Sequence, residues 1–285
     1  MQLSIGRATY ARLAVVACAF AAGAAGLASS AGAARLSSHG QLIHVVKPGL
    51  RLNANQSGNW FGYNQGTLEQ GGKLFHSITG NWTVPTATQH TAGQAESSSN
   101  WIGIGGGCID SGCTAGDSTL IQTGTEQDVD STGKASYSAW YELVPAPSLS
   151  VSMTVAPGDQ MQASISEVVA NSNVWTITLN DVTRGETFST TVPYPSTHAT
   201  AEWIEETPLE IGGSGGAGLA ALPNLTQSVF DLGTVNGAPA GLKPSEEIQL
   251  TGSNGNVIGS PSAPDSDTDG FGACAWATSC STPGS

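Results

Sequence analysis

The densest group of side chains that could perform acid–base chemistry lies in the stretch TAEWIEET, residues 200–207. Three of the chain's 22 acidic residues, Glu202, Glu205 and Glu206, surround one Trp-Ile pair there. A carboxyl group can take a proton from water and later return it to a leaving group. On a strand, Glu205 would share a face with Trp203, and the other two glutamates would lie on the opposite, more hydrated face. The local pattern does not choose among them, because glutamates on an edge strand commonly protect against aggregation.

A second polar candidate is Gln122, in the middle of the stretch STLIQTGTE, residues 118–126. Strand alternation places Leu120 on the same face as this amide, and Ile121 and Thr123 on the other. An amide that faces the interior must find hydrogen-bond partners. A lone Gln on a strand is most often a satisfied polar residue of this kind, so by itself it does not indicate catalysis.

Short strands are the elements that must position these side chains. From about Asn59 onward, stretches rich in Thr, Val, Ser and aromatic residues alternate with Gly, Pro, Asn and Asp turns, as in KASYSAWYELV and NVWTITLNDVTRGETFSTTV. No long stretch has apolar residues at helical spacing, and 37 glycines with 14 prolines would interrupt most helices. We therefore predict an all-β protein, an antiparallel β-sandwich in a single domain.

The N-terminal region has the order of a secretory signal peptide. Residues 1–34 contain Arg7 and Arg12, then an apolar run, then small residues. No later run approaches the ~18 apolar residues that span a bilayer. We therefore predict a soluble, secreted protein whose sandwich domain occupies residues 57–285. Residues 35–56 could be a short propeptide or a flexible N-terminal segment.

The charge balance limits the possible partners. The formal net charge is −13, and removal of residues 1–34, with two positive charges and no negative ones, makes it −15. Such acidity argues against nucleic acid and against an anionic membrane surface as partners. Only 11% of residues are charged, so few carboxylates can pair with Lys or Arg. Acid would break few ion pairs and relieve self-repulsion, and we expect the protein to tolerate it.

Four cysteines follow the predicted signal peptide. They are Cys108, Cys113, Cys274 and Cys280. In an exported chain they favour two disulfides, most simply the two short-range pairs, although three connectivities are possible. Neither pair has a nearby His, which disfavours zinc. Residues 265–270 match the opening half of a calcium-binding EF-hand loop, but Trp276 stands where that loop needs Glu, so a polar turn is favoured. We predict no metal and no cofactor.

Six short segments, taken together and in order, resemble the glutamic peptidase family, also called eqolisins. They are GNW ending at Trp60, NWTVPT at 81–86, NWIGIGG at 100–106, LIQTG at 120–124, YSAWYE at 137–142 and AEWIEE at 201–206. Each segment is short, but the set runs over most of the chain after the signal peptide. The family fold is a β-sandwich of two bent antiparallel sheets, in agreement with the class predicted from alternation. Its members are pepstatin-insensitive acid endopeptidases.

The resemblance implies a catalytic dyad of Gln122 and Glu206. By this similarity, Glu206 would activate the attacking water and protonate the leaving amine, and the Gln122 amide would stabilise the oxyanion. Glu202 belongs to the family motif but not to the dyad. Glu205 occupies a variable position of that motif, so we expect it to be replaceable.

The resemblance also suggests substrate-binding residues. They are Trp60, Trp101, Trp140 and Glu142. The tryptophans could equally be sandwich core, where buried Trp is ordinary. This chain departs from the family's type member at Gly105, which replaces an acidic residue, and at Ser138, which replaces Asp. These departures leave the pH optimum and the subsite preference open.

The function that we expect is therefore a secreted, monomeric acid endopeptidase acting on protein or peptide substrates. One alternative is a glycoside hydrolase on a lectin-like sandwich, with two carboxyls such as Glu142 and Glu206 about 5 to 10 Å apart. Another is a carbohydrate-binding sandwich in which tryptophans form the sugar platform. An intact Gln122 together with Glu206 favours the peptidase.

Overall fold

Antiparallel strands account for nearly all regular structure in residues 36–43, 55–211 and 218–285, which are the residues described by the computed structural model. The predicted signal peptide lies outside them. The helical structure in these ranges is one short 3-10 turn, η1 (Pro244–Glu246). Within the same ranges no helix is long and apolar enough to cross a membrane. The predicted all-β class is confirmed.

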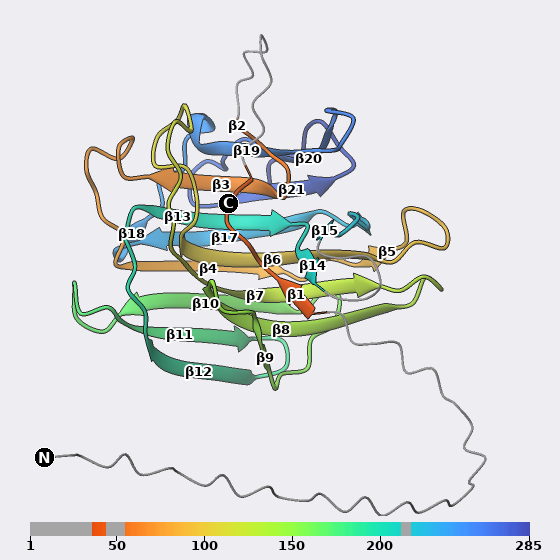
Figure 1. The fold of residues 1–285 in the computed structure, drawn as a ribbon, viewed down its shortest axis with the longest axis horizontal. Helices are drawn as coiled ribbons and strands as arrows, with labels where there is room; N and C mark the ends of the chain where they lie inside the picture. The colour runs from red at the N-terminus through yellow and green to blue at the C-terminus, as the bar shows by residue number, and fades with distance from the viewer. Residues whose placement is uncertain (1–35, 44–54, 212–217) are drawn as a thin grey trace, which may run out of the picture. The chain divides into compact units, whose positions relative to one another are not determined.

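One continuous sheet of 16 strands forms the body of the fold, and it folds back on itself as two facing halves (Figure 1). The first half contains, in spatial order, β12 (Glu186–Pro193), β11 (Val174–Asp181), β10 (Gln160–Glu167), β4 (Ser77–Thr83), β17 (Ser228–Val235), β21 (Phe271–Ala275) and β20 (Val257–Pro261). The second half contains β19 (Glu247–Thr251), β3 (Trp60–Gly66), β13 (Thr200–Glu206), β6 (Glu96–Gly105), β7 (Leu120–Val129), β8 (Ala135–Val144) and β9 (Leu149–Val151). β18 (Ala238–Pro239) joins β17, and β2 (Asn55–Ser57) runs parallel to β19.

Two small sheets complete the described fold. β1 (Leu36–Ser38), β14 (Leu209–Ile211) and β15 (Gly218–Leu219) form one of them, and β5 (Ala87–Thr88) pairs with β16 (Asn224–Leu225) in the other. Every pairing in these two sheets is antiparallel. β1 is the first described element, and in Figure 1 its red-orange ribbon crosses in front of strands of the second half.

The main hydrophobic core fills the space between the two halves. It contains Ile78 and Trp82 of β4, facing Ile102 of β6 and Trp203 of β13. Trp82 Nε1 donates a hydrogen bond to Thr125 Oγ1 of β7 at 2.9 Å, which links the halves through a buried polar contact. Burying such large side chains between two sheet faces supplies most of the driving force for this sandwich.

Gly80 of β4 permits the close approach of the two halves. A Cβ at this position would lie 2.8 Å from Cδ1 of Trp203 and 2.9 Å from Cγ2 of Ile102. Those distances are shorter than real carbon contacts, so any larger residue would push the halves apart. The position therefore needs a residue without a side chain because of packing, not because of its backbone angles.

The opposite face of the second half carries a separate group of buried apolar residues. They are Trp60, Trp101, Leu120, Trp140, Ile204 and Ile248. We call this surface of β19, β3, β13, β6, β7 and β8 the site face. Leu120 lies on it while Ile121 lies in the main core, as the alternation of STLIQTGTE predicted.

Both predicted short-range disulfides are present. Cys108 is bonded to Cys113, and Cys274 is bonded to Cys280. The first closes the loop after β6, and the second ties the last strand, β21, to the C-terminal segment.

Candidate active site

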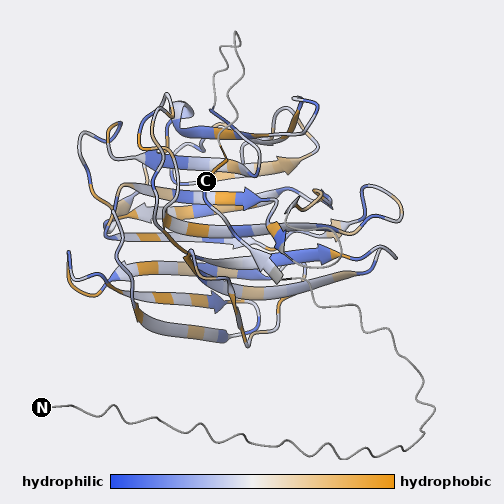
Figure 2. Ribbon diagram, viewed as in Figure 1, coloured by the Kyte–Doolittle hydropathy of each residue, from blue (hydrophilic) through white to orange (hydrophobic). Residues whose placement is uncertain are grey.

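The strand β13 places its glutamates in the interior of the sheet and not at an edge. It pairs with β3 on one side and with β6 on the other, and all seven of its residues are buried. The edge-strand interpretation was therefore wrong, and so was the expectation that one face of this strand would be hydrated. Figure 2 shows the hydrophilic end of β13 as blue within the body of the sheet. Buried carboxyls of this kind must be protonated, paired or hydrogen-bonded.

Gln122 and Glu142 face each other across the pair β7–β8. They are direct register partners, and Gln122 Nε2 donates to Glu142 Oε2 at 3.0 Å. Gly103 of β6 is the register partner of Gln122 on the other side. A Cβ at Gly103 would lie 2.8 Å from Cζ3 of Trp101. The missing side chain at Gly103 thus leaves room for the amide and the indole on the site face.

Glu206 is held by two neutral donors. Trp101 Nε1 donates to its Oε2 at 2.8 Å, and Asn59 Nδ2 donates to its Oε1 at 3.4 Å. Burial and then the charge of Glu142 raise the pKa of Glu206 well above its usual range. Burial also raises the pKa of Glu142 to about 7, although hydrogen bonds from His39, Ser38 and Gln122 oppose the shift. Glu142 is therefore neutral in acid, and burial favours the neutral form of Glu206 as well.

Glu126 is a third carboxyl of the site face, and sequence reasoning did not select it. In register, Glu206 is opposite Ser99 of β6, and Ser99 is opposite Glu126 of β7. Burial raises the pKa of Glu126 to about 8, with a further contribution from the charge of Asp128. Its position four residues after Gln122 on the same strand already implied a shared face.

The three tryptophans predicted to bind substrate all lie on the site face and are buried. Trp101 contacts Glu206 as described above. Trp140 Nε1 donates to Ser99 Oγ at 3.0 Å, and Trp60 Nε1 donates to the carbonyl of Gly40 at 3.2 Å. Gly40 belongs to the N-terminal segment, so part of this burial comes from residues 36–43.

His39 lies between the predicted catalytic residues, and sequence reasoning did not identify it either. Its carbonyl accepts a hydrogen bond from Gln122 Nε2, and its backbone N–H donates to Glu142 Oε2 at 2.8 Å. Its imidazole Nδ1 lies 3.5 Å from Glu206 Oε2. The ring is fully buried and stacks on Trp140 with centroids 3.6 Å apart. One residue of the chain itself therefore contacts Gln122 through its carbonyl and Glu206 through its imidazole.

Comparison with known protein families gives the chain a family. The model of the Peptidase A4 family matches residues 58–269, which is more than half of the chain. The chain belongs to the Peptidase A4 family. The resemblance to glutamic peptidases is thereby confirmed. The family supports a peptidase over the two alternatives, a glycoside hydrolase and a carbohydrate-binding protein. A comparison with curated protein sequences gives no match.

Solved glutamic peptidases share the fold of this peptidase. Scytalido-glutamic peptidase, solved with a peptide-based transition-state analogue, aligns with a TM-score of 0.59 and 20% identity, over 76% of this chain and 98% of that one. SCP-B, an eqolisin in complex with the tripeptide Ala-Ile-His, gives 0.56 and 19%, with the same coverage of 76% and 98%. Aspergilloglutamic peptidase from Aspergillus niger gives 0.50 and 20%, over 63% and 99%. These likenesses confirm the predicted β-sandwich, and its two layers are the two halves of one continuous sheet.

Gly105, which replaces an acidic residue of the family's type member, has a backbone that suits glycine. Its φ is +99°, and a Cβ there would lie 2.1 Å from the carbonyl oxygen of Thr119. An acidic side chain therefore requires a different backbone path at this point of the peptidase.

Glu205 and Glu202 occupy opposite faces of β13. Glu202 lies on the site face, fully buried, and strand register places it opposite Gly103. Glu205 lies in the core between the two halves of the sheet. There its carboxyl accepts hydrogen bonds from Asn100, from Gln127 at 3.1 Å and from Ser228 at 2.9 Å. These contacts argue against the expectation that Glu205 is replaceable, because its carboxyl joins three strands inside the core.

Replacing Glu205 by Ala is expected to destabilise the peptidase by roughly 3 kcal/mol or more, because three buried polar partners lose their acceptor. Glu205→Gln keeps the shape and one acceptor oxygen, so at pH 4 it should cost clearly less. Urea unfolding of both variants at pH 4 measures the difference. A Glu205→Ala protein as stable as the wild type would contradict this role.

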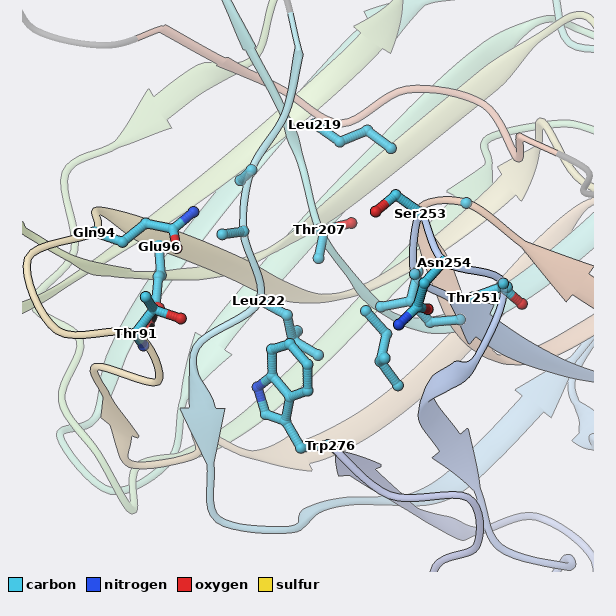
Figure 3. A pocket seen from close by; sticks show the side chains of 17 residues that line it. Thr91, Gln94, Glu96, Thr207, Leu219, Leu222, Thr251, Ser253, Asn254 and Trp276 are labelled. Carbon is cyan, nitrogen blue, oxygen red and sulfur yellow. Dashed lines mark hydrogen bonds between the residues drawn. The ribbon is translucent and has the colours of Figure 1, made fainter.

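A pocket of about 710 Å³ lies beside the site and not within it. Its walls include Thr207, which follows Glu206, together with Leu219 and Asn254 (Figure 3). Trp276 closes one side and stacks on His90 with ring centroids 3.6 Å apart. Neither predicted catalytic residue lines the pocket.

Two groups of side chains in the described ranges could hold a metal ion, and both lie away from Gln122 and Glu206. One consists of His76, Glu167 and His198, and the other of Asp231, Asp265 and Asp269, each with ligand atoms within 4.8 Å of one another. In the first group, His76 Nδ1 and His198 Nε2 already contact Glu167 Oε2 at 2.7 and 3.2 Å. The second includes two positions of the half-matched EF-hand stretch, joined by Asp231 from β17.

Proposed function

We propose that this member of the Peptidase A4 family is an exported, monomeric acid endopeptidase that uses Gln122 and Glu206 as its catalytic dyad. One observation carries the proposal. The peptide carbonyl of His39 accepts a hydrogen bond from the Gln122 amide, and the imidazole of the same residue lies 3.5 Å from the Glu206 carboxyl. An amide donor and a carboxyl that both contact one residue of an extended segment supply the groups that peptide hydrolysis requires.

In the proposed mechanism, the ionised form of Glu206 removes a proton from the attacking water as the water oxygen adds to the substrate carbonyl carbon. The Gln122 N–H groups donate to the oxygen of that carbonyl as negative charge develops on it. Glu206 then gives the proton to the departing nitrogen, and the C–N bond breaks. A carboxylate whose pKa is raised by burial is a stronger base than an exposed one, and it becomes the acid needed in the second step.

Gln122 suits a reaction in acid because its amide does not titrate. A Lys or His donor would change the charge of the site with pH, whereas an amide remains the same neutral donor throughout. The raised pKa values of Glu142 and Glu126 leave these neighbours uncharged in acid as well. The site is then best suited to polarise a carbonyl when the pH is low.

We propose that Trp60, Trp101, Trp140 and Glu142 bind the substrate main chain and side chains. The support comes from the contacts that residues 36–43 make with three of these residues. Glu142 accepts the backbone N–H of His39, Trp60 donates to the carbonyl of Gly40, and Trp140 stacks on the imidazole. Peptide ligands in the solved relatives support peptides as the substrate class.

The activity is tested by incubating an acid-denatured protein with the purified peptidase at pH 3 to 4, with pepstatin present. We expect internal peptide bonds to be cut at an unchanged rate in pepstatin, because no pair of aspartates takes part. Mass spectrometry of the products reports the cleavage. A preparation that cuts no peptide bond in acid, or that pepstatin blocks, would contradict the proposed function.

A further inference from the structure

Three side chains with metal-binding atoms lie at the end of β13 opposite Glu206. His76 comes directly before β4, Glu167 is the last residue of β10, and His198 comes two residues before β13. We call these three residues the end cluster. Glu206 is the last residue of β13, so at about 3.3 Å per residue the strand separates the end cluster from the predicted catalytic carboxyl by roughly 20 Å. The end cluster is therefore distinct from the proposed active site.

The main chain holds the three segments of the end cluster together. The N–H of Phe75 donates to the carbonyl of His198 at 2.9 Å, and the N–H of Glu167 donates to the carbonyl of His76 at 2.8 Å. His198 has a φ of +60°, in the left-handed region that few residues other than glycine adopt. Its ring packs against those of His76 and Trp175, with centroids 4.8 and 5.2 Å away. The backbone and the neighbouring rings thus fix the position of this imidazole.

Glu167 is a buried carboxyl that requires a cation beside it. Its side chain is fully buried, and no Lys or Arg of the described ranges forms an ion pair with it. Its Oε1 accepts the backbone N–H of Asn173 at 2.6 Å, and its Oε2 accepts that of Asn171 at 2.8 Å. Such hydrogen bonds favour the charged form of a carboxyl group. A buried charge of this kind needs a compensating positive charge.

Both imidazoles of the end cluster face the same oxygen of Glu167. His76 Nδ1 is 2.7 Å and His198 Nε2 is 3.2 Å from Glu167 Oε2, and the three atoms lie within 4.8 Å of one another. Because the carboxylate oxygen and a bare ring nitrogen both carry lone pairs, a proton or a metal ion must lie between them. Ligand atoms 2.0–2.1 Å from a tetrahedral zinc ion are about 3.4 Å apart. Small ring rotations therefore allow one ion to satisfy both contacts.

The donor set of the end cluster selects among metal ions. Two imidazoles and one glutamate are the protein ligands of several zinc sites in which water takes the fourth position. The His76 side chain is 27% exposed, which leaves the cluster open to water on this side. Calcium and magnesium prefer oxygen ligands throughout. The end cluster therefore suits zinc better than either of these ions.

We propose that His76, Glu167 and His198 bind one divalent transition-metal ion such as zinc, which fastens the two halves of the sandwich together. Glu167 and His76 belong to β10 and to the start of β4 in the first half, whereas His198 leads into β13 of the second half. The role is structural, because the cluster lies far from Gln122 and Glu206. Sequence reasoning did not select this group, since Glu167 is 91 residues from His76 and 31 residues from His198.

The test uses the purified peptidase, freed of metal by a chelator and dialysed at pH 7.5, because imidazole binds metals in its neutral form. Calorimetric titration with Zn²⁺ is expected to give one ion per chain. Free Zn²⁺ at 100 times the dissociation constant should raise the thermal unfolding midpoint by about 5–10 °C. A wild-type protein that zinc neither binds nor stabilises would overturn the proposal and leave protons as the only bridge between Glu167 and the histidines.

Two variants remove one ligand each while preserving the backbone. His76→Ala truncates a partly exposed side chain, and His198→Asn introduces a residue that tolerates the left-handed conformation. Each should weaken zinc binding by about 100-fold, so that the shift at the same Zn²⁺ concentration falls to about 1 °C. The zinc-induced shift is compared, and not the midpoint itself, because each variant also loses a contact with Glu167.

His90→Ala is the matched control, since His90 is an exposed histidine outside the end cluster. It should keep the full zinc-induced shift. A full shift in His76→Ala or in His198→Asn, or the loss of the shift in His90→Ala, would place the ion elsewhere and overturn the proposal. None of these outcomes bears on the proposed peptidase function, because the dyad residues are unchanged in every variant.

Discussion

Gln122→Ala is expected to lower kcat by about 10²–10³, and Glu206→Gln to lower it by about 10³–10⁴, with small changes in KM. The loss of one oxyanion donor costs roughly 10²–10³ in other hydrolases. Glu206 is asked to serve as base and then as acid, and general acid–base catalysis contributes about 10²–10⁴. Hydrolysis of an internally quenched peptide at pH 3.5 measures both effects.

The double variant, with both Gln122→Ala and Glu206→Gln, tests whether the two residues act together. Because the amide and the carboxyl act on the same transition state, removing both should cost little more than removing Glu206 alone. The thermal unfolding midpoints of all variants establish that they are folded. A folded Gln122→Ala protein with more than about a third of the wild-type kcat would show that the amide is not the oxyanion donor.

The second large effect is a loss of stability on the alkaline side. We expect the thermal unfolding midpoint to fall by roughly 10 °C or more between pH 4 and pH 8. Burial raises the pKa of Glu205 to about 7 and that of Glu126 to about 8. Each folded-state pKa is above the unfolded value, so the stabilisation is complete below about pH 4 and is lost as the pH rises through 7 to 8. Each pKa unit is worth about 1.4 kcal/mol, and each kcal/mol shifts the midpoint by about 2–4 °C at this size.

Glu167 is expected to limit the stability of the fold at the acid end of the pH range. Desolvation raises its pKa, but hydrogen bonds from His76 and from the backbone of Asn173 and Asn171, with the charge of His198, bring the value to about 2. A lowered pKa of this kind stabilises the fold above about pH 4, and the contribution is lost as the pH falls toward 2. The stability maximum should therefore lie between about pH 3 and 5.

Calorimetry from pH 2 to 9 tests this profile, with Glu205→Gln as the control variant. Glu205 lies between the two halves of the sheet and not on the site face, so its contribution does not depend on residues 36–43. The variant should lose less stability than the wild type between pH 5 and 8. A midpoint that is flat or rises toward pH 8 would show that the buried carboxyls are ionised without cost.

The fold class and the faces of individual strands could be predicted from the sequence, because side-chain alternation is a local property. Alternation placed Leu120 beside Gln122, and it placed Glu202 and Glu206 together, as observed. It could not show that β13 is a central strand, since both neighbours, β3 and β6, come from more than 90 residues earlier in the chain. The edge-strand interpretation and the hydrated face failed for this reason.

The residues that surround Gln122 and Glu206 were harder to predict from the sequence. Glu126 shares a strand with Gln122 and could have been selected by counting residues. His39 could not, because its place beside Glu206 depends on how a segment more than 160 residues away returns to the sheet. The structural role of Glu205 could not be predicted either, because a variable motif position says nothing about the three hydrogen bonds that it accepts here.

The most direct measurement of the central claim compares Glu206→Gln with Glu202→Gln on one quenched peptide at pH 3.5. Both residues are fully buried glutamates on the same face of β13, and both changes keep the shape of the side chain. We predict that Glu206→Gln loses about 10³-fold or more in kcat/KM and that Glu202→Gln stays within about tenfold of the wild type. A folded Glu206→Gln protein that retains activity, or a Glu202→Gln protein that alone loses it, would contradict the assignment of Glu206 as the catalytic carboxyl.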